Sequence, residues 1–262
     1  MKQLAAQLYT VRDFTKTAKD FAKTCQKIRK MGYEGVQLSA VGPIPPQEIQ
    51  KILEGEGLAC VATHVSLDRI EKETQAVIEE HLLWNCPHIA IGGFFPGETE
   101  ESKAKTWKDF SLRFSKIAKV LAKAGLVLGY HNHFHEFIQT SDGLTGYEHL
   151  IRELDPATTW FEVDTYWVAA AGKSPAALLR RLAHRVPCLH LKDGKVSRRK
   201  EGFAPDFAIT EVGDGNLDWP QILEAARYAG TQWYIVERDN GEMEPFRSLE
   251  RSFRNLRFTM GL

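Results

Sequence analysis

The opening of the chain reads LAAQL at positions 4–8, TKTAKDFAKTCQKIRKM at positions 15–31 and GVQL at positions 35–38. The two short apolar runs have the length and composition of buried strands. The segment between them carries apolar side chains at three- and four-residue steps, and Gly32 follows as a C-terminal stop, so we predict a helix over Thr15–Met31. The chain therefore begins with a strand, a helix and a second strand.

The same alternation continues to the end of the chain. After Leu4–Leu8 and Gly35–Leu38, strands are predicted at Ala59–His64, His88–Gly92, Leu126–His131, Thr159–Asp164, Val186–Leu191 and Tyr234–Glu237. Further helices are predicted at Pro46–Glu56, Glu71–Leu83, Thr99–Ala124, Gly146–Glu153, Pro175–Ala183, Trp219–Ala229 and Pro245–Phe258. Such strand-then-helix units predict an α/β fold, a closed (β/α)₈ TIM barrel, as a single domain over residues 1–262. The stretch Asp193–Gly215 is predicted as a long loop on the active side.

An open doubly wound sheet is the alternative fold. Neither G-x-G-x-x-G after the first strand nor G-x-x-x-x-G-K-[ST] occurs in the sequence, so the usual nucleotide signatures of open sheets are missing. The barrel is preferred for this reason.

Composition limits the partners and the location. The 262 residues include 34 Lys plus Arg and 34 Asp plus Glu, so no net charge attracts nucleic acid or anionic membranes. The four cysteines lie far apart, which indicates reduced thiols. The longest apolar run, Trp167–Ala171, is too short to cross a bilayer, and the N-terminus lacks the features of a signal peptide. We expect a cytoplasmic protein with neither nucleic acid nor membrane as partner, and a homo-oligomer is left open.

Ionisable residues gather at the C-terminal ends of the predicted strands, the face at which barrel active sites lie. These ends hold Gln7 and Tyr9, Gln37, His64, Gly92 and Gly93, His131 with His133 and Glu136, Asp164, His190 with Lys192, and Glu237. Residues 130–137 read YHNHFHEF, and in an extended chain His131, His133 and His135 share one direction. Buried together, such groups are costly unless they are paired or bound to a cation. We therefore expect a divalent metal: Mn²⁺, Fe²⁺, Co²⁺ or Zn²⁺ suit these ligands, and we add Mg²⁺.

Seven motifs, in this order, resemble the sugar phosphate isomerase/epimerase superfamily, the relatives of xylose isomerase, over nearly the whole chain. They are QLYTVRD (7–13), GYEGVQL (32–38), YHNHxxEF (130–137), FEVDTYWVAAAG (161–172), LHLKD (189–193), VGDGNLDW (212–219) and YIVERD (234–239). The resemblance implies a (β/α)₈ barrel with a divalent metal held by Glu, Asp, His and Glu at the ends of the fifth to eighth strands. Asp164, His190 and Glu237 match the last three ligands. For the first, His131 stands where the family has its glutamate and Glu136 supplies that residue type five positions later, so both are candidates.

The expected activity is that of an isomerase or epimerase that abstracts a proton next to the carbonyl of a sugar, keto-sugar or sugar derivative, through a metal-stabilised ene-diolate. Glu237 would move the proton on one face, and His133 or His131 on the other. Lys192 would stabilise an oxyanion or hold a hydroxyl. The carbohydrate substrate is expected to contact His64, Gln7, Tyr9, Gln37, Trp167 and Lys192, with Phe94 and Phe95 as further apolar walls.

Three rival activities are weighed against this one. A lyase or dehydratase acting on a keto-sugar or 3-keto-glycoside is the alternative, because the same ene-diolate can expel a β-hydroxyl or glycosyl group; His131 in place of the first glutamate favours it. Gln37, where many relatives have Glu, is a second departure that warns against close analogy. An apurinic endonuclease is disfavoured by the zero net charge. A non-catalytic sugar-binding protein is disfavoured by the full set of ionisable strand ends.

Overall fold

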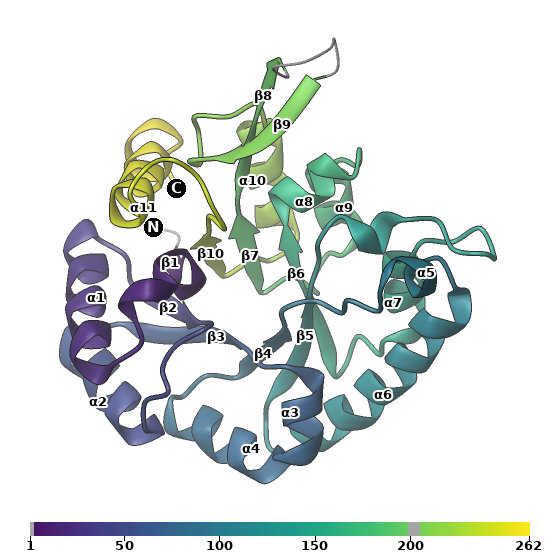
Figure 1. Ribbon diagram of the computed structural model, residues 1–262, viewed down its shortest axis with the longest axis horizontal. Helices are drawn as coiled ribbons and strands as arrows, with labels where there is room; N and C mark the ends of the chain where they lie inside the picture. The colour runs from purple at the N-terminus through teal and green to yellow at the C-terminus, as the bar shows by residue number, and fades with distance from the viewer. Residues whose placement is uncertain (1–2, 199–204) are drawn as a thin grey trace.

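The structure is a computed structural model, and it describes residues 3–198 and 205–262. Parallel strands close into a barrel, and helices surround it (Figure 1). Around the barrel the strand order is β1, β10, β7, β6, β5, β4, β3, β2. The strands are β1 (Gln3–Gln7), β2 (Gly35–Leu38), β3 (Ala59–His64), β4 (His88–Ile91), β5 (Val127–His131), β6 (Thr159–Asp164), β7 (Cys188–Leu191) and β10 (Trp233–Val236). The predicted (β/α)₈ barrel is confirmed, and each predicted strand overlaps one barrel strand.

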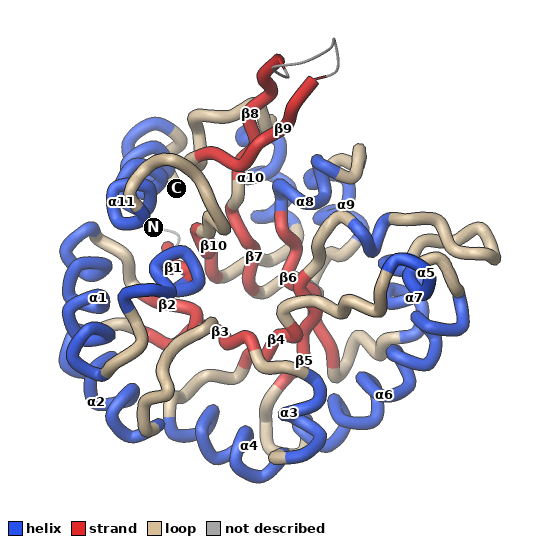
Figure 2. Tube along the Cα trace, viewed as in Figure 1, coloured by secondary structure: helices blue, strands red, loops and turns tan. Residues whose placement is uncertain are grey.

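The helices form the outer layer (Figure 2). They are α1 (Ala18–Met31), α2 (Pro46–Glu56), α3 (Leu67–Lys72), α4 (Thr74–Leu83), α5 (Glu98–Glu101), α6 (Ala104–Ala122), α7 (Gly146–Glu153), α8 (Thr165–Ala170), α9 (Pro175–Arg181), α10 (Trp219–Tyr228) and α11 (Pro245–Arg254). Shorter helical turns cover Leu8–Phe14, His135–Phe137 and Asn255–Thr259. None of the helices described here has the length and apolar character needed to cross a lipid bilayer.

Local sequence signals explain where α1 begins and ends. The side chain of Thr17 accepts a hydrogen bond from the backbone N–H of Asp20, which satisfies one free donor of the first turn. Gly32 has a φ of 107° and its N–H bonds to the carbonyl of Arg29, a conformation that costs glycine little. The helix therefore starts three residues later than predicted from Thr15, and it ends at Met31 as predicted.

The barrel interior is filled in two layers of different polarity. Near the N-terminal ends, the side chains of Ala5, Ala62, Ala90, Trp160, Cys188 and Ile235 pack together. Trp160 fills the space beside Gly129, where a Cβ would lie 2.2 Å from the indole. Two residues further along three of these strands come Gln7, Glu162 and His190, all fully buried. Because side chains alternate along a strand, these polar groups stand directly above the apolar layer and below the mouth of the barrel.

The structure corrects three predictions of secondary structure. The predicted helix over 71–83 begins earlier and is divided at Glu73 into α3 and α4, and the one over 99–124 is divided into α5 and α6. The stretch predicted as a loop contains an antiparallel hairpin, β8 (Asp193–Arg198) and β9 (Pro205–Thr210), which projects beyond the barrel in Figure 1. Its residues 199–204 lie outside the described part. Beyond the buried Asp193 and Gly194, the residues of the two strands are exposed or only partly buried, so the sequence holds no fully buried apolar run here of the kind that predicted the barrel strands.

Candidate active site

Four side chains from neighbouring strands meet at the C-terminal end of the barrel. His131 ends β5, Asp164 ends β6, His190 lies in β7 and Glu237 follows β10. Each offers a ligand atom, these atoms lie within 4.8 Å of one another, and all four residues are buried. We call these four residues the outer group. The structure thus brings together four of the five predicted metal ligands.

The outer group fits a divalent cation by its chemistry. It holds two imidazoles and two carboxylates, a mixed set that transition-metal ions accept. Asp164 uses Oδ1 to cap α8, accepting from the N–H of Trp167 at 2.9 Å. Its Oδ2 is buried and accepts no hydrogen bond from the described residues, although the Lys192 ammonium lies 2.9 Å away. This oxygen is already held by the charge of Lys192, and a carboxylate oxygen has further lone pairs that a metal cation could use.

Lys192 places a permanent positive charge beside the outer group. Its Nζ lies 2.9 Å from Asp164 Oδ2, 2.8 Å from Glu237 Oε2 and 2.9 Å from Asp239 Oδ2, and the side chain is fully buried. Burial acts to lower the pKa of this ammonium, but the three carboxylates outweigh it and raise the pKa well above its usual value. Lys192 therefore stays protonated and acts as a hydrogen-bond donor.

The charge states within the outer group follow from the same competition. Burial raises the pKa of Asp164 to about 6, opposed by the charge of Lys192. For Glu237, burial acts upward but the charges of Lys192 and His190 hold its pKa well below the usual carboxyl range. Burial acts to lower the pKa of His190, yet Glu162 and Glu237 raise it to about 10. At neutral pH both carboxylates are ionised and His190 carries a proton, which a bound cation would have to displace.

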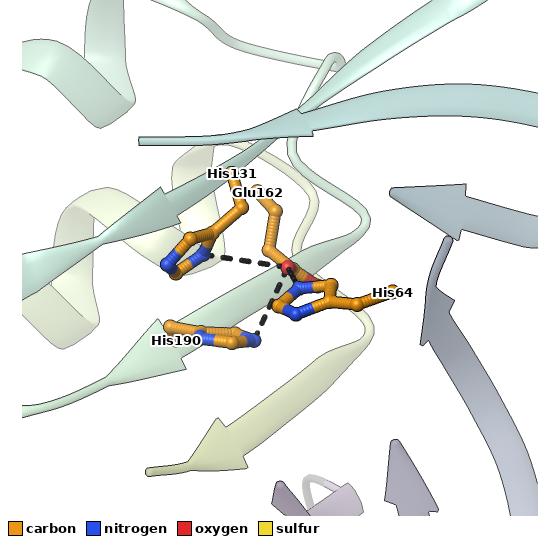
Figure 3. Close-up of side chains that lie close together, drawn as sticks. All are labelled: His64, His131, Glu162 and His190. Carbon is orange, nitrogen blue, oxygen red and sulfur yellow. Dashed lines mark hydrogen bonds and ion pairs between the residues drawn. The ribbon is translucent and has the colours of Figure 1, made fainter. Parts of the chain in front are cut away.

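A second cluster lies against the outer group, within the barrel. It consists of His64, His131, Glu162 and His190, which we call the inner group (Figure 3). Glu162 is fully buried, and its Oε2 lies 2.6 Å from His64 Nε2. The same oxygen lies 3.2 Å from His190 Nε2 and 3.4 Å from His131 Nδ1. The two groups share His131 and His190.

Sequence reasoning missed Glu162, although a signal was present. Glu162 lies two positions before Asp164 in the predicted strand Thr159–Asp164, between the apolar residues Phe161 and Val163. Alternation along a strand turns residues two apart to the same side, so Glu162 had to face the barrel interior with Asp164. An acid in the middle of a strand buried on both faces needs partners, and the inner group supplies them.

Glu136, the remaining predicted ligand, belongs to neither group found among the described residues. Its Oε1 accepts from the Tyr130 hydroxyl at 2.8 Å, and its Oε2 accepts from the backbone N–H of His133 at 2.8 Å. Burial raises the pKa of this carboxyl. The strand ends at His131, and the short 3₁₀ helix His135–Phe137 turns Glu136 back onto it. Of the two candidates for the first ligand, only His131 lies in the outer group.

The same turn separates the three histidines that were expected to share one direction. His131 and His133 line the cavity above the outer group, whereas the Nε2 of His135 bonds to the carbonyl oxygen of Phe94 at 2.7 Å. Burial lowers the pKa of His131 to about 3, and the charge of nearby His190 acts in the same direction. Burial lowers the pKa of His133 to about 2, and the neighbouring His131 ring also lowers this pKa. Both rings are therefore neutral at pH 7.

The cavity at the mouth has a volume of about 780 Å³. Of the predicted substrate contacts, Tyr9, His64, Trp167, Phe94 and Phe95 line it, together with Glu237 and Asp239. Gln7, Gln37 and Lys192 do not line it and are fully buried below. Gln37 donates to Glu162 Oε1 at 2.8 Å and faces His190 Nε2 with its own Oε1 at 2.6 Å, so it supports the inner group.

A closed parallel barrel with a filled interior, surrounding helices and its ionisable residues at the C-terminal face has the architecture of the TIM-barrel enzymes. Within that class the chain belongs to the xylose isomerase-like TIM barrel family, whose model matches residues 25–258. The resemblance seen in the sequence motifs is thereby confirmed.

Individual proteins show the same likeness. The inosose dehydratase of Clostridium tetani is 28% identical over 154 residues, which cover 54% of this chain and 49% of that protein. The chain spans about half the length of curated relatives such as this one. A sugar phosphate isomerase/epimerase from Parabacteroides distasonis superposes with a TM-score of 0.81 at 19% identity, covering 98% of each chain. A xylose isomerase-like barrel from Mycobacterium smegmatis in complex with magnesium superposes with a TM-score of 0.74 at 14% identity, covering 98% of this chain and 95% of the other. These likenesses between structures concern the fold.

Proposed function

We propose that this protein is a divalent-metal-dependent lyase that removes water from a keto-polyol or keto-sugar ring, after taking a proton from the carbon next to the carbonyl. The observation that carries the proposal is the outer group: four buried residues whose ligand atoms lie within 4.8 Å of one another. Two of them, His131 and Glu237, line the cavity that His133 also lines. The inosose dehydratases among the relatives support elimination over epimerisation.

A cation held by His131, Asp164, His190 and Glu237 would act as a Lewis acid that stabilises negative charge developing on the substrate oxygens. His133 is placed to take the proton, because its ring lines the cavity beside Glu237. Its Nδ1 is buried and has no hydrogen-bond partner among the described residues. Glu237, which also lines the cavity, is the second proton carrier. Elimination requires that one of these groups return its proton to the departing hydroxyl.

The walls of the cavity favour an uncharged carbohydrate. Phe94, Phe95 and Trp167 offer aromatic faces, while Glu237 and Asp239 offer hydrogen-bond acceptors. Arg113, the one arginine or lysine that the described lining contains, is already paired with Asp68 at 2.9 Å and Glu71 at 2.6 Å. A phosphate group would face acidic side chains here, so we propose an unphosphorylated ring as substrate.

Product analysis tests this function. The Mn²⁺-loaded protein is incubated with inosose and with a panel of keto-sugars and 3-keto-glycosides, and the products are analysed by mass spectrometry. We expect a product lighter than its substrate by one water. Unchanged substrate throughout the panel, with Mn²⁺ bound, would contradict the proposal.

Epimerisation is the second candidate, because Glu237 and His133 line the same cavity and can also serve opposite faces of one carbon. It would leave the mass unchanged in ordinary water. In heavy water an epimerase of this kind would place deuterium on the carbon next to the carbonyl without loss of water. That result would favour epimerisation over elimination as the activity of this protein.

A further inference from the structure

We propose that Glu162 is a positioning residue that fixes the ring orientation and tautomer of His64, His131 and His190, and so prearranges the outer group for its cation. This inference rests on the metal dependence of the proposed function. Glu162 itself is assigned no contact with the cation or the substrate, because it is fully buried, does not line the cavity and belongs to the inner group alone. Figure 3 shows the inner group.

The contacts of Glu162 are divided between its two oxygens. Oε1 accepts from Gln37 Nε2 at 2.8 Å. Oε2 alone faces the three imidazoles, at 2.6 Å from His64, 3.2 Å from His190 and 3.4 Å from His131. A carboxylate can only accept hydrogen bonds, so its charge favours a proton on each ring nitrogen turned toward it. His64 Nε2 is hydrogen-bonded to Oε2 at 2.6 Å, whereas the Nε2 of His190 is hydrogen-bonded to Gln37 Oε1 at 2.6 Å and lies 3.2 Å from Glu162. His131 Nδ1 is buried without a hydrogen bond from the described residues, 3.4 Å from the same oxygen.

The consequence for His190 is visible in its other nitrogen. Its Nε2 faces Glu162 and Gln37, while Nδ1 lies 3.0 Å from Glu237 Oε2 in the outer group. Nδ1 is therefore the atom available to a cation. In His131 it is Nδ1 that faces Glu162, which leaves Nε2 on the opposite edge of the ring. The charge of Glu162 thus favours protons on opposite nitrogens in the two shared ligands, and in His190 the Gln37 amide oxygen acts in the same direction.

Several groups depend on the Glu162 carboxylate at the same time. The residue is fully buried, and the groups in contact with its carboxylate are the three imidazoles and the Gln37 amide. When a metal-ligating histidine donates the N–H of one ring nitrogen to a carboxylate, its other nitrogen is left unprotonated and free to bind the metal. Loss of such a carboxylate typically lowers metal affinity by ~10–100-fold. One residue that serves two ligands at once should lie at the upper end of that range.

Mn²⁺ titration by calorimetry tests the role. Glu162→Gln keeps the shape and removes the charge, and we expect it to weaken Mn²⁺ binding by ~10–100-fold while one ion per chain still binds. Glu162→Asp, which restores the charge, should recover part of the affinity. The matched control is Glu136→Gln, because Glu136 is an equally buried carboxyl that contacts Tyr130 and the His133 backbone but neither group. Its Mn²⁺ affinity should match the wild type.

Equal affinity in wild type and Glu162→Gln would overturn the inference and leave the proposed function intact. A wild-type stoichiometry of two ions per chain, falling to one in Glu162→Gln, would overturn it as well, because Glu162 would then be a ligand. Absence of Mn²⁺ binding by the wild type would instead contradict the proposed function, and the inference with it.

A second measurement uses the wild type and does not depend on whether the variants fold. Long-range ¹H–¹⁵N NMR of the Zn²⁺-loaded, ¹⁵N-histidine-labelled protein reports which nitrogen of each ring carries the proton. We expect Nε2–H for His64 and His190 and Nδ1–H for His131. Nδ1–H in His64, or Nε2–H in His131, would overturn the inference.

Discussion

The two halves of the barrel mouth differ in what they carry. Strands β5, β6, β7 and β10 deliver imidazoles, carboxylates and the Lys192 ammonium, whereas β1 to β4 end in two glutamines, one histidine and the glycines that follow β4. In the second half, Gly92 lies so close to His64 that a Cβ there would stand 3.0 Å from Nδ1. We expect the charged half to bind the metal and transfer protons, and the neutral half to contact the substrate. Variants of the two halves should therefore fail in different ways.

The largest effect is expected from the charged half, in Asp164→Asn. The amide can still cap α8 through its oxygen but no longer offers a negative ligand, so Mn²⁺ affinity should fall by more than the ~10–100-fold typical of a lost outer partner. Calorimetry measures the affinity, and circular dichroism the fold. Asp218→Asn is the matched control, since Asp218 caps α10 in the same way, far from the outer group in sequence. Tight Mn²⁺ binding by Asp164→Asn would show that the outer group is not the metal site.

Next come the two proton carriers. Glu237→Gln and His133→Ala should each lower kcat by ~10²–10⁴-fold, provided that Mn²⁺ remains bound, because each removes one step of general acid–base assistance. Turnover is measured at saturating Mn²⁺ with the substrate identified by product analysis. Exposed Glu242, in the turn after Glu237, provides the control Glu242→Gln. A wild-type kcat in His133→Ala would exclude that ring from proton transfer.

The affinity for Mn²⁺ should rise with pH. Between the pKa of Asp164, about 6, and that of His190, about 10, the metal-free protein carries one proton on His190 that the ion must displace. Affinity should therefore increase about tenfold per pH unit in this window, and more steeply below pH 6, where Asp164 also binds a proton. Titrations from pH 5.5 to about 8.5 measure the slope. An affinity independent of pH would show that His190 is not protonated in the free protein.

The smallest effect is expected from the neutral half. Phe95 is 67% exposed and its ring lies 5.1 Å from that of His133, so Phe95→Ala removes a wall and no charge. We expect KM to rise several-fold with kcat unchanged, since one aromatic contact contributes ~0.5–1.5 kcal/mol. Steady-state kinetics separate the two constants. Phe258→Ala, at an exposed ring near the C-terminus, is the control. A fall in kcat rather than a rise in KM would remove the distinction between the halves.

The same division explains what the sequence could and could not predict. Asp164, His190 and Glu237 were predicted because each ends or follows an apolar run, and parallel strands bring such ends to one place. Glu136 was kept as a ligand candidate because it supplies the residue type that the family has at the first position, whereas the 3₁₀ turn at His135 directs its carboxylate to the Tyr130 hydroxyl and the His133 backbone. The role of Gln37 changed from substrate contact to support for Glu162, since pairing across the barrel interior leaves no trace in linear order. The β8–β9 hairpin was not predicted either, because its apolar side chains are exposed or only partly buried and do not form the buried run of a barrel strand.

Lys192 has a practical consequence for work with this protein. With an ammonium held between three carboxylates, removal of a metal from the proposed site would leave a positive charge in place, so we expect the chain to stay folded on chelation. Small zinc modules behave in the opposite way and unfold when their ion is taken. We therefore expect that the proposed metal site can be emptied by chelation and loaded with different divalent ions in turn. The resulting preparations can then be compared with the same folded chain in each.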